Sequence, residues 1–126
     1  MPSSRLEHVN VTVADPVAAS ELMQALFDWQ VRWQGPALGG GHTVHVGSDS
    51  QYLALYAPRA PATPAKDFPK GRPLNHIGVE VDDLDATEAR VIAAGLVPFS
   101  HGDYEPGRRF YFFDPNGIEY EVVSYR

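Results

Sequence analysis

An internal repeat constrains this chain more than any other feature of its sequence. The segment LEHVNVTVAD at residues 6–15 matches LNHIGVEVDD at residues 74–83, slightly more than half the chain further on. Both segments alternate apolar and polar residues, which predicts a half-buried β-strand. Both end in an aspartate, a residue type that caps the helix that follows it. The chain is therefore expected to fold as two similar modules.

Each half continues with a helix and three further strands. The first helix is expected to start at Asp15-Pro16, and the second to run from about Asp83 to a C-cap at Gly95. The expected strands are residues 30–34, 42–47 and 51–57 in the first half, and 96–101, 108–114 and 117–124 in the second. Turns rich in Gly, Asn and Asp separate these strands. The sequence thus predicts an α+β fold made of two βαβββ modules.

A proline-rich segment, APRAPATPAKDFPKGRP, joins the two halves. So much proline excludes a central strand or helix and favours an extended connector. With 126 residues the chain has the length of one domain. We expect a single domain over residues 1–126, with module one at 1–57, a linker at 58–73 and module two at 74–126.

Charge and composition exclude several classes of function. The formal net charge is −6 and no basic run is present, which argues against nucleic acid and anionic membranes as partners. The chain has no cysteine, so disulfides, thiolate nucleophiles and iron–sulfur clusters are excluded. No signal peptide or membrane-spanning segment is recognised, so we expect a soluble, cytoplasmic protein that acts on a small molecule.

Strand alternation places potential metal ligands on polar faces. His8 and His76 occupy equivalent positions of the repeated strand, opposite its valines, and Glu119 and Glu121 lie opposite Ile118, Tyr120 and Val122. Two imidazoles and a carboxylate suit divalent iron, manganese, zinc, nickel or cobalt. The alternative is that both histidines are half-buried residues with a structural role.

Three segments carry a family resemblance: LEHVNVTVADP, LNHIGVEVDDLD and RRFYFFDPNGIEYEVV. Together they resemble the vicinal oxygen chelate (VOC) superfamily of glyoxalases, bleomycin- and fosfomycin-resistance proteins and extradiol dioxygenases. In this family the metal-binding Glu follows the DPxG turn by four residues, which here is Glu121. The resemblance implies two βαβββ modules forming a cupped mixed sheet around one divalent metal ion, held by His8, His76 and Glu121. Fe(II) is favoured, with Zn, Ni, Mn or Co as alternatives.

The resemblance departs from glyoxalase I at one position. The fourth ligand of that enzyme matches Ala54, which cannot bind metal, and His42 or His45 could compensate for it. Three ligands resemble extradiol dioxygenases, as does the segment FYFFDPNGIEYE. This implies Tyr111 and His101 as catalytic residues.

The remaining candidates are residues that would bind the substrate. Arg109 shares a face with Tyr111 by alternation and suits a substrate carboxylate. His45, Trp33 and Tyr104 complete this set of substrate-binding candidates.

The resulting functional hypothesis is a divalent-metal-dependent enzyme acting on a small molecule with adjacent oxygens. An extradiol-type dioxygenase is favoured. The alternatives are a glyoxalase-like lyase or isomerase that uses Zn, Ni or Co, and a metal-free binding module of the resistance type. A homodimer is also expected from the resemblance.

Overall fold

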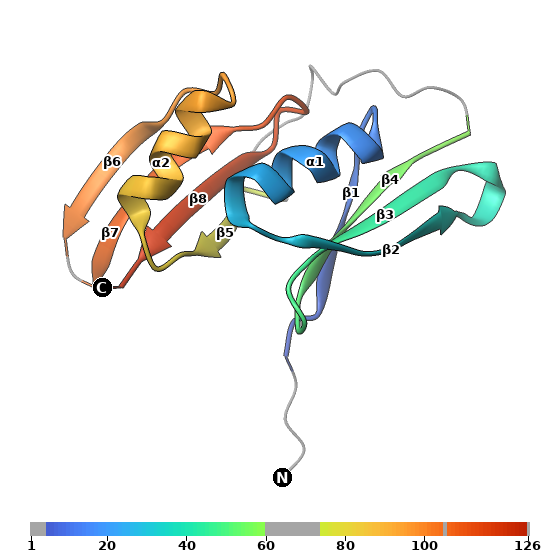
Figure 1. Cartoon of the computed structure of the whole chain (residues 1–126), viewed down its shortest axis with the longest axis horizontal. Helices are drawn as coiled ribbons and strands as arrows, with labels where there is room; N and C mark the ends of the chain where they lie inside the picture. The colour runs from blue at the N-terminus through green and yellow to red at the C-terminus, as the bar shows by residue number, and fades with distance from the viewer. Residues whose placement is uncertain (1–4, 60–73, 105, 126) are drawn as a thin grey trace, which may run out of the picture. The chain divides into compact units, whose positions relative to one another are not determined.

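Eight strands and two α-helices make up the part of the chain that the computed structural model describes, which is residues 5–59, 74–104 and 106–125 (Figure 1). The chain divides into two compact units, Met1–Thr63 and Pro64–Arg126, and each is described by itself. Most of the linker expected at 58–73 lies outside the described residues.

Module one is a four-stranded mixed sheet with one helix. Strand β1 pairs in parallel with β4, and β4, β3 and β2 follow as antiparallel neighbours, giving the order β1-β4-β3-β2. A short 3₁₀ turn, η1 (Leu38–Gly40), connects β2 to β3. The elements are β1 (His8–Thr12), α1 (Pro16–Phe27), β2 (Gln30–Pro36), β3 (His42–Gly47) and β4 (Tyr52–Ala57).

Module two repeats this topology strand for strand. Its order is β5-β8-β7-β6, again with one parallel pair, β5 with β8, and antiparallel pairs elsewhere. The elements are β5 (Ile77–Glu80), α2 (Leu84–Ala93), β6 (Phe99–Tyr104), β7 (Gly107–Phe113) and β8 (Glu119–Ser124). The α+β fold of two βαβββ modules is therefore confirmed.

Matching aspartate caps start the two helices. The Asp15 carboxylate accepts a hydrogen bond from the Ala18 amide at 3.1 Å, and the Asp83 carboxylate accepts one from Ala86 at 3.0 Å. Helix α2 ends at Ala93, and Gly95 follows its C-cap residue Ala94 with a φ of +83°, a left-handed conformation that glycine adopts without a steric penalty.

Each sheet is covered by its helix on one face only (Figure 1). In module one, Met23 and Leu26 of α1 are buried with Val44 and Leu55 of the sheet. In module two, Val91 of α2 is buried with the apolar side chains of β7 and β8, which are Phe110, Phe112, Tyr120 and Val122. Burial of one such side chain contributes about 1.5–3 kcal/mol. The opposite face of each sheet carries the polar side chains predicted from strand alternation.

No helix in the described ranges has the length and apolar character needed to cross a membrane.

Candidate metal and ligand site

In module two, His76 and Glu121 form a close pair. Glu121 lies on β8 opposite Gly78 of β5, which brings it beside His76, the residue immediately before that strand. His76 Nε2 lies 3.0 Å from Glu121 Oε1, and Nδ1 of the same ring lies 2.8 Å from the Asn75 side-chain oxygen. The histidine is one-third exposed, so the pair is accessible from the face opposite α2.

Glu121 is also contacted from β7. Arg109 Nη1 donates a hydrogen bond to Glu121 Oε2 at 3.0 Å, and Tyr111, directly opposite Glu121 in the strand register, hydrogen-bonds to the same carboxylate. Burial, and then the Glu121 charge, raise the pKa of the Tyr111 phenol. Tyr111 therefore stays protonated at neutral pH and can donate a hydrogen bond. Its ring meets the His76 ring edge-on, at 5.7 Å between centroids.

Arg109 has donors that no described residue satisfies. Its Nε and Nη2 atoms are buried and have no hydrogen-bond acceptor among the described residues. The Tyr104 ring lies against the guanidinium, with Cζ 4.9 Å from the ring centroid. A buried donor left unpaired costs about 1–3 kcal/mol. Arg109 and Tyr104 thus lie beside the His76–Glu121 pair, and their role in substrate binding stays a prediction.

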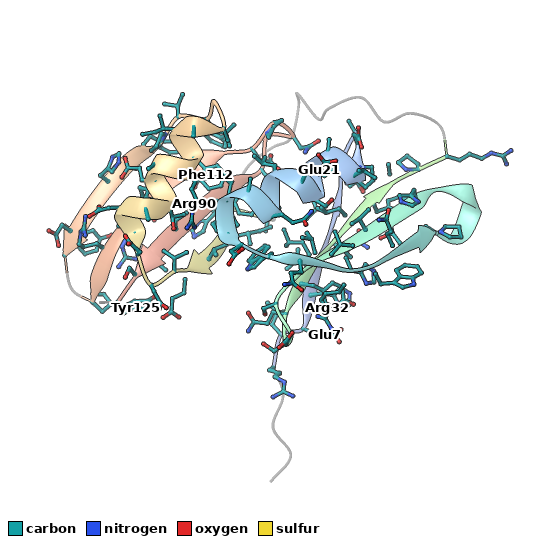
Figure 2. The ribbon with its side chains drawn as sticks, in the orientation of Figure 1. Glu7, Glu21, Arg32, Arg90, Phe112 and Tyr125 are labelled. Carbon is teal, nitrogen blue, oxygen red and sulfur yellow. The ribbon has the colours of Figure 1, made fainter. Side chains whose placement is uncertain are left out.

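Module one has its own cluster on the face opposite α1, and it is centred on Tyr52. The His8 and His45 rings both stack on Tyr52, at 4.8 and 4.5 Å between centroids, and Trp33 contacts His45 at 5.2 Å. Arg32, labelled in Figure 2, lies over the Tyr52 ring at 4.6 Å. His8, His45 and Trp33 were predicted from the sequence, whereas Tyr52 and Arg32 were not.

The repeat explains how the two clusters correspond. Ala54 pairs with Asn10 of β1 and with His45 of β3, just as Glu121 pairs with Gly78 of β5 and with Tyr111 of β7. Alanine therefore stands in module one where glutamate stands in module two, and His45 stands in the place of Tyr111.

The two histidines of β3 differ in position. Burial, and then the charges of His8 and Arg32, lower the pKa of His45, so its ring is neutral at pH 7. His42 shares the helix-covered face with Val44 and lies 3.2 Å from the Gln34 side chain. Only His45 of this pair faces the cluster.

His101 does not join the cluster of module two. Its Nε2 lies 2.7 Å from Glu88 of α2, and its ring stacks on the buried Phe110, so it occupies the helix-covered face. The register shifts between Phe99 and Gly102, and Ser100 has a φ of +53°. This β-bulge inserts one residue and reverses the alternation. The expectation that His101 could act beside Tyr111 is therefore corrected.

The donors present suit a divalent metal, but only two of the three predicted ligands come together within one module. Imidazole nitrogen and carboxylate oxygen at His76 and Glu121 are donors that manganese, iron and zinc accept. His8 lies in module one, and the described residues contain no group of three or more His, Asp or Glu able to hold a metal ion.

The fold and these clusters define a class of protein, and comparison with known families identifies it. The model of the Glyoxalase/Bleomycin resistance protein/Dioxygenase superfamily matches residues 5–122. The chain belongs to this superfamily. The resemblance drawn from the three sequence segments is confirmed.

Solved structures agree with the fold. A glyoxylase/bleomycin resistance protein/dioxygenase domain from Frankia sp. EAN1pec is 23% identical, with 99% of this chain and 100% of that chain covered and a TM-score of 0.84. The fosfomycin resistance protein FosX from Listeria monocytogenes, solved with Mn(II) and sulfate, is 16% identical, with 98% and 93% covered and a TM-score of 0.75. FosX from Mesorhizobium loti is 20% identical, with 97% and 92% covered and a TM-score of 0.70. No curated protein matches the chain significantly.

Proposed function

We propose that this chain is a divalent-metal-dependent enzyme that acts on a small molecule with two adjacent oxygen atoms. The His76–Glu121 pair, with its 3.0 Å contact on the face opposite α2, is the observation that carries the proposal. His8 holds the equivalent position of the repeated strand in module one, and the resemblance to the superfamily implies it as a further ligand.

The surrounding residues fit this role. A bound divalent ion supplies Lewis-acid chemistry and a template for two substrate oxygens. Tyr111, kept protonated by its raised pKa, donates a hydrogen bond to a substrate oxygen in place of its bond to Glu121. Asn75 accepts a hydrogen bond from His76 Nδ1, which leaves Nε2 as the coordinating nitrogen.

One structural relative supports the proposal that the substrate carries two adjacent oxygen atoms. One FosX structure from Listeria monocytogenes contains Mn(II) and 1S,2S-dihydroxypropylphosphonic acid, a compound with two neighbouring hydroxyl groups. By analogy, we propose that a pair of adjacent oxygens chelates the metal in this chain too.

The position of His101 bears on the type of reaction. Extradiol ring cleavage was expected to use His101 as acid and base, and this ring is paired with Glu88 on the far face. We therefore favour an oxygen-independent reaction of the lyase or isomerase kind. An iron(II)-dependent extradiol dioxygenase is the second candidate, because Ala54 stands where a fourth ligand would be and leaves a three-donor set.

The metal site is tested by calorimetric titration of metal-free protein with Zn(II), Mn(II) and, without air, Fe(II). We expect one equivalent per chain, and at least about ten-fold weaker binding in His76→Ala and Glu121→Gln, because loss of even an outer partner of a metal ligand has such effects. Glu80→Gln is the matched control: Glu80 is exposed and lies on the same face of β5. Equal metal affinity in Glu121→Gln and Glu80→Gln would refute the site.

Two assays then distinguish a dioxygenase from a lyase or isomerase. A dioxygenase loaded with Fe(II) consumes oxygen with catechols and forms a yellow ring-opened product. A lyase or isomerase loaded with Zn, Ni or Co consumes no oxygen and exchanges a substrate proton for deuterium. Absence of metal binding under all conditions would leave a metal-free binding module.

A further inference from the structure

Arg109 offers an unused pair of hydrogen-bond donors beside the proposed metal ligands. Its Nη1 is bonded to Glu121, while Nε and Nη2 are buried without an acceptor among the described residues. In a guanidinium group Nη2 lies trans to Cδ, so the Nε–H bond and one Nη2–H bond point the same way along one edge. The two free donors of Arg109 are therefore the two parallel donors of a single edge.

This edge matches the geometry of an oxyanion. Two parallel N–H donors bind the two oxygens of a carboxylate, or two oxygens of a phosphonate, as a bidentate pair. A neutral ligand with one acceptor satisfies only one of the two donors. The unpaired edge therefore selects for a charged, two-oxygen group.

Aromatic side chains lie next to Arg109. The Tyr104 ring packs on the guanidinium and also crosses Gly102, where an added Cβ would lie 2.6 Å from the Tyr104 ring. Further rings continue along the same face of the sheet: Phe99 contacts Tyr111 at 6.1 Å and stacks on Phe113 at 5.2 Å. The donors are thus fixed in a planar, aromatic environment that suits a flat or ring-bearing acid.

We propose that the Nε–Nη2 edge of Arg109 binds an oxyanion of the substrate, so that the substrate is a small acid carrying adjacent oxygens. This names the substrate class of the proposed site and to that extent rests on the proposed function. With a divalent ion bound near Glu121, the local charge is positive and the acid is attracted more strongly.

The proposal is tested with three probes that share one ring: benzoate, phenylphosphonate and neutral benzamide. Each is titrated into ¹⁵N-labelled protein, both metal-free and Zn(II)-loaded, while the Arg109 Nε–Hε signal is followed by NMR. That signal is assigned by its disappearance in Arg109→Lys. Arg108→Gln is the matched control, because Arg108 lies on the opposite face and binds Asp85 at 2.9 Å.

We expect benzoate to shift the Arg109 Nε–Hε signal saturably and to bind at least ten-fold more weakly to Arg109→Gln, with Arg108→Gln unchanged. The preference for benzoate over benzamide should disappear in Arg109→Gln, which a merely structural role of Arg109 would not cause. Tighter binding of phenylphosphonate than of benzoate would assign a phosphonate, and the reverse order a carboxylate.

Equal binding of benzoate and benzamide to the wild type, or an unmoved Nε–Hε signal, would overturn the proposal. Both readouts use the wild-type protein, so they decide the matter even where Arg109→Gln fails to fold. Zinc binding without any response of Arg109 would refute the oxyanion site alone. Benzoate binding through Arg109 in a protein that takes up no zinc would refute the metal site alone.

Discussion

Asp114 fixes the turn that brings Glu121 into place opposite Tyr111. One oxygen of its carboxylate accepts hydrogen bonds from the backbone amides of Asn116 and Ile118, both at 2.9 Å. The turn closes with a further bond from the Asp114 amide to the Ile118 carbonyl, also 2.9 Å. The residue is only 7% exposed, and burial raises the pKa of its carboxyl group although the two backbone hydrogen bonds lower it.

Removal of this acceptor should destabilise module two. We expect Asp114→Ala to lower the free energy of unfolding by about 1–3 kcal/mol, because the buried Ile118 amide and the part-buried Asn116 amide lose their acceptor. Asp114→Asn keeps an oxygen acceptor and removes a buried charge, so its stability at pH 7 should equal or exceed that of the wild type. Urea denaturation of both variants checks this, and a large loss in Asp114→Asn would contradict it.

The raised pKa of Asp114 also predicts how the stabilities of the wild type and of Asp114→Asn depend on pH. Because the pKa of Asp114 is higher in the folded state, the folded protein binds more protons than the unfolded protein at pH values between the two pKa values. The stability of the wild type therefore falls as pH rises from the unfolded pKa through the folded pKa. The stability of Asp114→Asn relative to the wild type should therefore increase as pH rises above about 4, and this difference should disappear at lower pH. Urea denaturation of wild type and Asp114→Asn from pH 3 to 7 measures this difference, and a constant difference would contradict it.

Strand alternation predicted correctly which residues share a face at most positions. It placed Arg109 with Tyr111, and the structure adds the contacts of both with Glu121. It did not find Arg32 or Tyr52 as partners of the module-one histidines. The cause is local: the register of β2 shifts between Val31 and Trp33, which gives Arg32 an irregular position over the Tyr52 ring. Alternation alone does not reveal such a shift.

The bulge in β6 determines on which face of the sheet the His101 side chain lies. Phe99 remains paired with Tyr111, but the inserted residue turns His101 toward α2. The only sequence signal for this bulge is its glycine and serine content, and Ser100 adopts its left-handed conformation without glycine's freedom. The sequence thus predicted the strand, but not the residue at which its faces exchange.

His101 should therefore be dispensable for ligand binding. We expect His101→Gln to keep the metal affinity and the benzoate affinity of the wild type. Its stability should fall by less than about 1 kcal/mol, because an exposed ion pair contributes little. Calorimetry and urea denaturation measure these quantities, with Glu88→Gln as the partner variant. Loss of metal binding in His101→Gln alone would show that His101 serves the site.

Each of the two modules forms its own four-stranded sheet, and the strand order is the same in both. The repeat predicted the common topology, since equivalent segments adopt equivalent strands and helices. It did not predict the unequal chemistry of the two halves, in which Ala54 and His45 replace Glu121 and Tyr111. Such differences follow from single residues and not from the pattern of the repeat.

The tryptophans report whether module one takes part in metal binding. Both of them, Trp29 and Trp33, lie in module one, and Trp33 contacts His45 in the cluster that includes His8. Zinc should therefore change the tryptophan fluorescence of the wild type. The His8→Ala variant should show no such change, and it should bind zinc at least about ten-fold more weakly. Unaltered fluorescence at saturating zinc would confine the metal to module two.

The homodimer and the cytoplasmic location inferred from the sequence remain predictions, and analytical ultracentrifugation with and without zinc tests the first of them. We expect a mass of two chains in both conditions. A single-chain mass throughout would contradict the dimer.

The parallel pairing of β1 with β4 has a consequence for how the chain is made. The first strand of module one finds its partner in the last strand of that module, so the sheet is completed when Ala57 is available and needs no later residue. During synthesis the first half can therefore finish its hydrogen-bonded sheet while the second half is still inside the ribosome. Module two is closed in the same way by β5 and β8, so its sheet is completed only when the residues of β8 have been made.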